Sequence, residues 1–472
     1  WWGIRVSPYT HNEMWLKEGP AEYSGHLAEE WIYGRDAFVD VVKDNHLYVL
    51  REAHVQDNGF QVLSPIVDAE IYGLHTYYKG ASVMHNLRGY LGDSLFRAGM
   101  THAHAALYDT AMTAGDFRDA LEAGTGADLD AFFDAWIFQP GYSVFVVQDL
   151  TVSPNGNQWD VELTIRQRLR EAWNMHQNVP LDLDLLDAGR QRRGFEVMAS
   201  GEFTTVTVTT DIEPVMAILN GHTRLNQARM DHELTTWPGN GFGSSLPYVD
   251  FRLLADAVVD TTFVRIEHVW AGPDQDLVGW DIDQISGTHY WHVDGIWPAG
   301  TSFNGRVIYD GGSPGDLDVE LFSTASEADL ILVYRPDPSF PWEVYPDYSV
   351  TIGNPLDKYG FLYIDVLLPG DYAFATGDAV AAVQEPATAP MPLIVRPNPV
   401  ADRLSVDMDE PGELVLEVLG LDGRLVKRRR TQVEGPEAVS LDVSDLVDGA
   451  YLLRTWNQRT RTGGTARFVV AR

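Results

Sequence analysis

The sequence reads WLKEGPAEYSGHLAEEWIY at residues 15–33, directly after WWGIRVSPYTHNEM at residues 1–14. Ala, Leu and Glu recur at helical spacing through Ala21–Tyr33, which predicts an amphipathic helix. Pro20 must lie in the first turn of this helix, because proline is tolerated there and not in the interior. The same helical spacing recurs at Ala81–Tyr90 and Ala127–Phe138. Residues 1–145 are therefore predicted to be mostly helical.

The pattern then changes from a helical period to a period of two. Val161–Ile165 and Thr204–Val208 alternate apolar and polar residues, which predicts a small β-sandwich over residues 146–235. Residues 236–385 are β-rich as well, with many Gly, Pro, Asp and Trp residues, and their role stays open. Short, regularly spaced strands over residues 393–472 predict another antiparallel sandwich. The expected fold class is multidomain α + β.

Composition removes several classes of function. The 472 residues contain no cysteine, which excludes disulfides, thiolate zinc sites and cysteine nucleophiles. There are 34 basic and 68 acidic residues, and a net charge of −34 repels nucleic acid and anionic lipid. No apolar run reaches about 18 residues, so no membrane-spanning helix is expected. Neither nucleic acid nor a membrane is an expected partner.

The charge is unevenly distributed. Residues 386–472 hold 12 basic and 12 acidic residues, so the whole net charge lies on residues 1–385. The segment PATAPMP at 386–392 lies at this change and is predicted to be a linker. Only five of the basic residues are lysines. Two origins remain open for this acidic, lysine-poor composition: a surface adapted to concentrated salt, or a GC-rich genome.

Residues 1–23 resemble zinc aminopeptidases of the aminopeptidase N type. In that family H-E-x-x-H-Q precedes W-W-G, and W-L-N-E-G-F-A-x-Y follows. WWG at residues 1–3 and WLKEG at residues 15–19 match these motifs. The resemblance implies the helical half of a thermolysin-like peptidase domain over residues 1–145 and makes Glu18 the third zinc ligand. The second histidine would then lie two places before Trp1, so this domain is expected to be N-terminally truncated.

The chemistry explains why the family uses these residues. Catalytic zinc takes three protein ligands, keeps one position for water and lowers the pKa of that water. H-E-x-x-H places two imidazoles on one helix face and supplies the general base. The sequence departs from the family pattern at Ile4, at Lys17, where Asn is usual, and at Pro20. Since the chain contains no H-E-x-x-H, it is not expected to hold Zn²⁺ in the family's way by itself.

A second motif, TYYKGASVMHNLR at residues 76–88 followed by LGD at 91–93, resembles the family's Y-x-K-G-A helix. The resemblance makes Tyr77 the donor of a hydrogen bond to the developing oxyanion, a large catalytic contribution. A third motif, ADLDAFFDAWIFQPGY at residues 127–142, resembles the end of the family's helical lobe. It carries no chemistry, but the three motifs occur in the family's order.

Residues 393–472 resemble the C-terminal sorting domain of the type IX secretion system. The resemblance rests on PNP at 397–399, LDGRLV at 421–426, GAY at 449–451 and a basic final strand. It implies that the type IX secretion machinery is a partner and that the protein is secreted or lies on the cell surface, outside the outer membrane. The basic run KRRR at 427–430 is interpreted as an exposed hairpin edge.

Other candidate sites have plainer interpretations. The side chains of His102 and His104 point about 200° apart on a helix, which does not suit a shared metal ion. For this pair, and for His289 and His292, ordinary surface or core histidines are favoured over metal ligands. Two groups of acids have the oxygen ligands of a calcium site, although a plain acidic surface is favoured: Asp274, Asp276, Asp281 and Asp283, and separately Asp310, Asp316 and Asp318. Four tryptophans could form a sugar- or peptide-binding face, with core packing favoured: Trp270, Trp280, Trp291 and Trp297.

Two functions are carried forward. The first is a secreted or cell-surface zinc-dependent aminopeptidase that acts on a peptide or protein substrate, with Glu18 as metal ligand and Tyr77 as catalytic residue. The second is a non-catalytic surface binding or adhesion protein built on a degenerate peptidase scaffold. The residues that precede Trp1 in the gene would separate the two.

Overall fold

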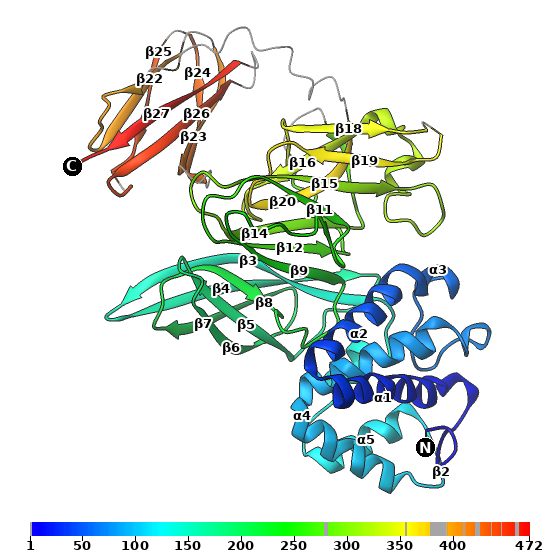
Figure 1. Ribbon diagram of the computed structural model, residues 1–472. Coiled ribbons are helices and arrows are strands. Elements are labelled where there is room, and N and C mark those ends of the chain that lie inside the picture. Colours follow the sequence, from blue (N-terminus) through cyan, green and yellow to red (C-terminus); the bar gives the residue numbers. More distant parts are fainter. Residues whose placement is uncertain are drawn as a thin grey trace.

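The computed structural model describes most of the chain, and the described residues are 2–277, 282–354, 356–377, 393, 395–408, 411–420, 425–435, 437–444, 446–457 and 462–472. Trp1, Trp280, Asp281 and the expected linker 386–392 lie outside the described residues. The described residues form a helical unit followed by three antiparallel β-units, shown in Figure 1. The predicted multidomain α + β fold is confirmed.

The helical unit is built around two long helices that pack against each other. Its helices are α1 (Trp15–Tyr33), α2 (Arg35–Tyr48), the π-helical turn η2 (Val49–Ala53), α3 (His54–Gln56), the π-helical turn η4 (His75–Lys79), α4 (Gly80–Ala106), α5 (Ala114–Thr125) and α6 (Asp130–Trp136). Four short elements complete it: the 3₁₀ turns η1 (His11–Glu13) and η3 (Asp68–Glu70), and the parallel strands β1 (Val6–Pro8) and β2 (Thr110–Met112).

Local sequence explains several helix boundaries. Gly34, with φ of 94°, separates α1 from α2, and Gly92, with φ of 71°, kinks α4. Thr113 caps α5 in a capping box whose other member is Asp116. Pro20 is the sixth residue of α1 and lies past its first turn, so the prediction that it belongs to the first turn is wrong: the helix begins earlier, at Trp15, and lacks the hydrogen bond that an N–H at position 20 would donate to Leu16. The apolar faces of these helices close over one buried core that includes Trp15, Leu16, Met84, Phe117 and Trp136.

The second unit is a sandwich of two three-stranded sheets. One sheet has the order β3 (Tyr142–Asn155), β4 (Gln158–Arg170), β7 (Phe203–Thr210), and the other β6 (Arg192–Ala199), β5 (Val179–Asp187), β8 (Pro214–Leu219). Alternate side chains of β4 and β5 point inward and bury Val161, Leu163, Leu181 and Leu183. This explains the alternation seen in the sequence.

The third unit is a larger sandwich. Its five-stranded sheet has the order β10 (Ser245–Leu246), β11 (Phe251–Ala257), β15 (Ser302–Asp310), β19 (Tyr359–Ile364), β18 (Tyr348–Ile352). The seven-stranded sheet has the order β17 (Glu343–Val344), β16 (Leu330–Arg335), β20 (Gly370–Gly377), β14 (Tyr290–Ile296), β12 (Thr262–Val269), β9 (Arg229–Thr236), with β13 (Ile282–Ile285) also on β20. Two 3₁₀ turns, η5 (Leu321–Ser323) and η6 (Glu327–Asp329), precede β16.

Strand β9 lies in this third unit, although its residues fall within the range 146–235 expected for the first sandwich. The charged side chains of β9 explain this placement, because they form ion pairs with charged side chains of β12. Across the β9–β12 register Asp231 lies opposite Glu267, and Glu233 lies opposite Arg265. Arg265 contacts all three of these acids at 2.8–3.1 Å. The partner strand supplies the countercharge, so β9 read alone gives no sign of its sheet.

The first three units pack closely on one another. An apolar cluster joins η2 and the start of β3 to the outward face of the seven-stranded sheet, and it includes Leu50, Tyr142, Val144, Trp270 and Trp342. Lys43 of α2 also reaches the carboxylate of Asp231 on β9 at 2.8 Å. These contacts place the helical unit beside the second and third units (Figure 1).

The C-terminal unit is a small sandwich at the opposite end of the molecule from the helical unit (Figure 1). One sheet has the order β21 (Val395–Arg396), β22 (Arg403–Met408), β25 (Glu437–Asp442), and the other β24 (Leu425–Val433), β23 (Gly412–Gly420), β26 (Gly449–Asn457), β27 (Thr462–Val470). The run KRRR at 427–430 lies on β24, which is an edge strand. Arg428 there contacts Glu417 at 3.0 Å and Glu343 of the third unit at 2.5 Å.

Candidate functional site

Glu18 and Tyr77 lie side by side where α1 crosses the start of α4. Glu18 is in the first turn of α1, and Tyr77 is in the middle of η4, directly before α4. The two backbones touch at Gly19 and Gly80: a Cβ added to Gly19 would lie 2.9 Å from the Gly80 Cα. Only glycine permits this approach, and it brings the residue before Gly19 against the π-helical turn.

The Glu18 carboxylate has a basic neighbour. The Lys17 Nζ atom lies 3.0 Å from a Glu18 carboxylate oxygen, and the Glu18 side chain is 14% exposed. The Lys17 stem in turn lies against Gly3, because a Cβ on Gly3 would meet Lys17 side-chain carbons at 2.4 Å. The hydrogen bond and charge of Glu18 raise the pKa of Lys17. Lys17 therefore stays charged and competes with any other cation for Glu18.

Tyr77 presents a protonated phenol to this carboxylate. Burial raises the pKa of Tyr77, and the negative charge of Glu18 and the hydrogen bond to it raise it further. The Tyr77 phenol therefore lies close enough to the Glu18 carboxylate to act on it as a hydrogen-bond donor. A hydrogen-bond donor that keeps its proton at neutral pH is what stabilisation of an oxyanion requires.

The described residues alone do not complete a zinc site around Glu18. In the part of the chain that the structure describes, one group brings three His, Asp or Glu ligand atoms within 4.8 Å of one another, and Glu18 is not in it. Catalytic zinc needs three protein ligands. A zinc site that used a Glu18 oxygen would need two further donors, and no group among the described residues brings them to Glu18.

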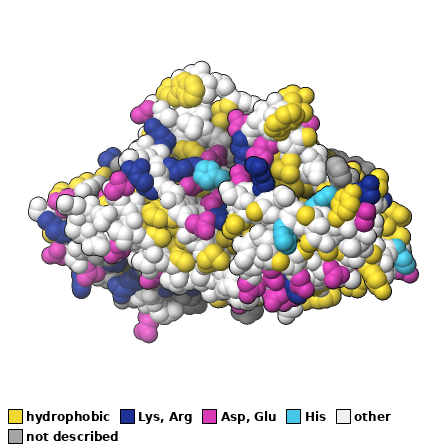
Figure 2. Space-filling model, turned by 90° about the horizontal axis from the view of Figure 1, so that it is seen from below, with side chains coloured by type: hydrophobic (Ala, Val, Ile, Leu, Met, Phe, Trp, Pro, Cys, Tyr) yellow, Lys and Arg dark blue, Asp and Glu magenta, His cyan; other side chains and the backbone are white. Residues whose placement is uncertain are grey.

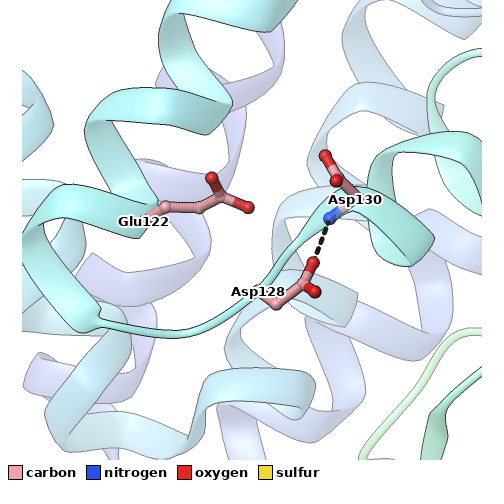
Figure 3. A group of neighbouring side chains, drawn as sticks. All are labelled: Glu122, Asp128 and Asp130. Carbon is pink, nitrogen blue, oxygen red and sulfur yellow. Dashed lines mark hydrogen bonds between the residues drawn. The ribbon is translucent and has the colours of Figure 1, made fainter.

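The one group of three among the described residues is Glu122, Asp128 and Asp130, at the turn between α5 and α6 (Figure 3). Each acid already has a structural partner. Glu122 accepts from the Leu129 N–H at 2.8 Å, and Asp128 accepts from the Asp130 N–H at 3.1 Å. Asp130 contacts Arg118 at 2.8 Å. These bonds account for the three acids as part of the turn that begins α6.

The other histidine candidates have local partners. The ring of His104 packs edge-on against Trp2, and His102 lies against Gly124. His289 bonds to Asp318 at 2.9 Å, while His292 bonds to Asp371 at 2.7 Å. Within the described residues, none of these histidines belongs to a group of three metal donors.

The acidic calcium candidates are also engaged elsewhere. Asp274 contacts Arg166, Arg168 and Arg335 at 2.5–3.0 Å, which leaves it no role as an ion ligand. Asp318 accepts the Asp310 N–H and bonds to His289. Over the described range, neither set of aspartates brings three donors together. Asp281 lies outside the described residues.

The tryptophan candidates are mainly core residues. Trp270 and Trp291 are buried in the core clusters of the third unit, and Trp297 is half-buried beside Phe303.

On the face shown in Figure 2, Lys and Arg side chains lie among Asp and Glu side chains. That face therefore offers no continuous basic track to a phosphate backbone.

Sequence reasoning missed a buried polar network behind Tyr77. The His75 ring bonds to Asp57 at 2.7 Å, and the Lys79 ammonium donates to the Gln61 carbonyl at 3.1 Å. Burial lowers the pKa of Lys79 to about 7. His75 and Lys79 flank Tyr77 in the sequence, so their spacing is visible there. Their loop partners 57–61 carry no pattern that ties them to this helix.

The chain is similar to known proteins over two of its parts. Residues 1–136 match the Peptidase family M1 domain, and residues 395–470 match the Secretion system C-terminal sorting domain. Probable aminopeptidase 2 of Sulfurisphaera tokodaii is 25% identical over 221 residues, which cover 46% of this chain and 27% of that protein. Aminopeptidase N of Rattus norvegicus is 27% identical over 166 residues, covering 32% and 17%.

Aminopeptidase M1 of Arabidopsis thaliana is 30% identical over 189 residues, which cover 35% of this chain and 21% of that protein. The chain thus spans 17–27% of the length of these three relatives. Legionella pneumophila aminopeptidase A, solved in complex with aspartic acid, matches with 17% identity and a TM-score of 0.37, covering 48% of this chain and 25% of that one. Residues 1–136 are part of a peptidase family M1 domain, the family of aminopeptidase N, and residues 395–470 are a type IX C-terminal sorting domain.

Proposed function

We propose that this chain belongs to a secreted or cell-surface zinc-dependent aminopeptidase. In this proposal Glu18 is a zinc ligand, and Tyr77 donates a hydrogen bond to the oxyanion that forms from the peptide carbonyl. The observation that carries the proposal is the contact of Glu18 with a protonated Tyr77, fixed by the Gly19–Gly80 crossing inside the family match.

The electrostatics of this contact support the role of Tyr77. A donor that is already oriented costs no reorganisation when charge develops, and removal of such a donor typically lowers kcat by about 10²–10³. The Tyr77 phenol is held by its turn and by Glu18, and its raised pKa keeps the proton in place. A peptide carbonyl bound beside Glu18 would lie within reach of this phenol.

The proposed zinc site needs two further ligands and a general base. In the family they come from H-E-x-x-H, and the sequence contains no such motif. We propose Glu18 as the third ligand of a site whose other ligands and base come from such a motif. The proposed zinc dependence rests on that motif.

The C-terminal unit supports the proposed location. A sorting domain of this kind implies transport by the type IX secretion machinery, and we propose that residues 393–472 engage it. Within the described residues, no helix has the length and apolarity needed to cross a membrane. The proposed destination is the cell surface or the medium.

One observation favours the second candidate, a non-catalytic surface binding protein on a degenerate peptidase scaffold. Lys17 stands where Asn is usual in the family, and its ammonium lies 3.0 Å from the proposed ligand oxygen. A permanent cation there weakens binding of a second cation.

Metal analysis and hydrolysis of amino-acyl substrates by the complete gene product separate the two functions. The enzyme proposal predicts one zinc per chain and turnover that is lost on chelation and restored by zinc. In Glu18→Gln we expect zinc content and kcat to fall together, because an amide is a poor zinc ligand. The matched control is Glu22→Gln, one helical turn further along α1 and half-buried, which should keep both. A zinc-free, inactive protein would refute the enzyme proposal and leave the binding protein as the remaining candidate.

A further inference from the structure

The face of η4 opposite Tyr77 is packed against a buried polar loop. Residues 75 and 79 are four apart, about one helical turn, so their side chains leave one side of η4, and Tyr77 between them leaves the other. His75 and Lys79 are 0% and 1% exposed and both contact the loop 57–61. Tyr77 faces Glu18.

Asp57 holds the start of this turn. Its carboxylate accepts three hydrogen bonds: from the Leu74 N–H at 3.0 Å, the His75 N–H at 2.7 Å and the His75 Nδ1–H at 2.7 Å. The first two are backbone donors at a helix N-terminus, which carboxylates satisfy well. A Cβ on Gly73 would lie 2.5 Å from the Asp57 carboxylate, so glycine is needed for this approach.

The His75 ring is held in one tautomer. Its Nε2 atom accepts the Gln61 backbone N–H at 3.2 Å and so carries no proton. The proton is then on Nδ1, where it is donated to Asp57. Lys79 completes the arrangement by donating to the Gln61 carbonyl at 3.1 Å. Both polar backbone groups of Gln61 are thus bound by η4, one turn apart.

We propose that Asp57 and His75 are positioning residues for Tyr77, which fix the rotation of η4 so that the phenol points at the Glu18 site. The proposal rests on the proposed function for its effect on catalysis. Asp57 and His75 do not touch the reacting atoms. They act by orienting η4, and a displacement of about 1 Å at such a donor can cost up to about 10²-fold in rate.

Two kinds of variant test this role. Asp57→Asn keeps size but presents an amide N–H₂ to groups that are themselves donors, so η4 must rotate or shift. His75→Leu removes the donor and the acceptor together. His75→Gln retains one donor and one acceptor and should restore the position of η4 in part. The matched control is His289→Gln, which disrupts an equally buried His–Asp pair in the third unit.

The first measurement is the kinetics of the complete gene product with an amino-acyl substrate. We expect Asp57→Asn and His75→Leu to lower kcat by about tenfold or more, with KM changed by less than about twofold. His75→Gln should recover at least part of that loss. His289→Gln should lower the melting temperature and leave kcat unchanged, because it destabilises without moving η4.

The second measurement needs no activity. In the 472-residue chain, labelled Tyr77 ring protons should show nuclear Overhauser effects to the Glu18 side chain. Asp57→Asn should weaken these effects, and His289→Gln should not. Unchanged Overhauser effects and unchanged kcat in folded Asp57→Asn and His75→Leu would overturn the positioning role. An inactive parent in which Asp57→Asn still weakens the Overhauser effects would refute the peptidase function and leave the positioning role standing.

Discussion

At the scale of single residues, the candidate site depends on a carboxylate, a phenol and an ammonium group in contact. Motif spacing in the sequence is enough to predict Glu18 and Tyr77 as a site. It does not predict that Lys17 turns its ammonium onto Glu18, because that contact depends on Gly3, whose Cα leaves room for the Lys17 stem. The role of Asp57 cannot be predicted from the sequence either, because it depends on how the loop 57–61 folds against η4.

Replacement of Lys17 by the family's usual Asn should favour metal binding. The Lys17→Asn substitution removes the competing cation from the Glu18 carboxylate. The zinc dissociation constant of the complete gene product should therefore fall by about fivefold. This factor corresponds to the loss of a partly exposed ion pair worth about 1 kcal/mol. Competition with a chromogenic chelator measures this constant. An unchanged constant would show that Lys17 does not oppose the metal.

At the scale of elements, the site depends on the crossing of α1 with η4 and α4. The helical spacing predicts that α1 and α4 are helices, although the apolar side chains at the end of α1, Trp31 to Tyr33, are exposed rather than buried. The π-helical turn η4 is not predictable from that spacing, because its geometry is imposed by tertiary bonds such as Asp57–His75 and Asn45 to the Tyr78 carbonyl. The sheet to which β9 belongs is not predictable for the same reason: its charges are interpretable only beside β12.

The crossing can be tested with a single methyl group. In Gly19→Ala the new Cβ would lie 2.9 Å from the Gly80 backbone, so α1 and η4 must separate, and we expect about 1–3 kcal/mol of destabilisation. Urea unfolding followed by circular dichroism measures it. The control is Gly25→Ala on the same helix, where a Cβ meets nothing within 4 Å and should add up to about 1 kcal/mol of stability. Equal effects of the two substitutions would contradict the close crossing.

At the scale of the whole molecule, buried charges are paired with one another inside the protein. The net charge of −34 is a property of sequence, but its internal pairing is not. His292 on β14 shows this pairing most clearly. Burial would lower the pKa of His292, but the hydrogen bond and charge of Asp371, with the charges of Asp294 and Glu267, outweigh burial and raise it to about 9.

This pairing predicts how stability depends on pH. A histidine whose folded pKa is raised from about 6.5 to about 9 stabilises the fold fully below pH 6.5, and this contribution is lost as pH rises through 9. His292 alone should therefore lower the free energy of unfolding between pH 6.5 and 9 by up to about 1.4 kcal/mol per pH unit. Lys79 acts in the opposite direction above about pH 7, because it is neutral in the folded protein while the unfolded chain still binds its proton. Chemical denaturation of the wild type and of His292→Gln across this range isolates the His292 contribution, since the variant should lack this fall and have the more positive slope. Equal slopes in the two proteins would assign the effect to other groups.

Histidines that stay neutral in the folded protein should add a second dependence of stability on pH, at acidic pH. Burial lowers the pKa of His46 to about 4 and that of His85 to about 3. The unfolded chain binds protons at these sites below about pH 6.5 and the folded chain does not, so stability should also fall as pH drops from about 6.5 towards about 4. The melting temperature should therefore fall as pH drops below about 6.5.

The central claim is that Tyr77 and Glu18 form the catalytic site of a zinc peptidase. The most direct measurement is kcat for hydrolysis of an amino-acyl substrate by the zinc-loaded complete gene product, compared between Tyr77→Phe and Tyr78→Phe. Tyr78 is the neighbouring half-buried tyrosine, packed on Tyr48, and does not face Glu18. We predict a loss of about 10²–10³ in kcat for Tyr77→Phe, with zinc content kept, and little change for Tyr78→Phe. Undiminished turnover in Tyr77→Phe would contradict the account.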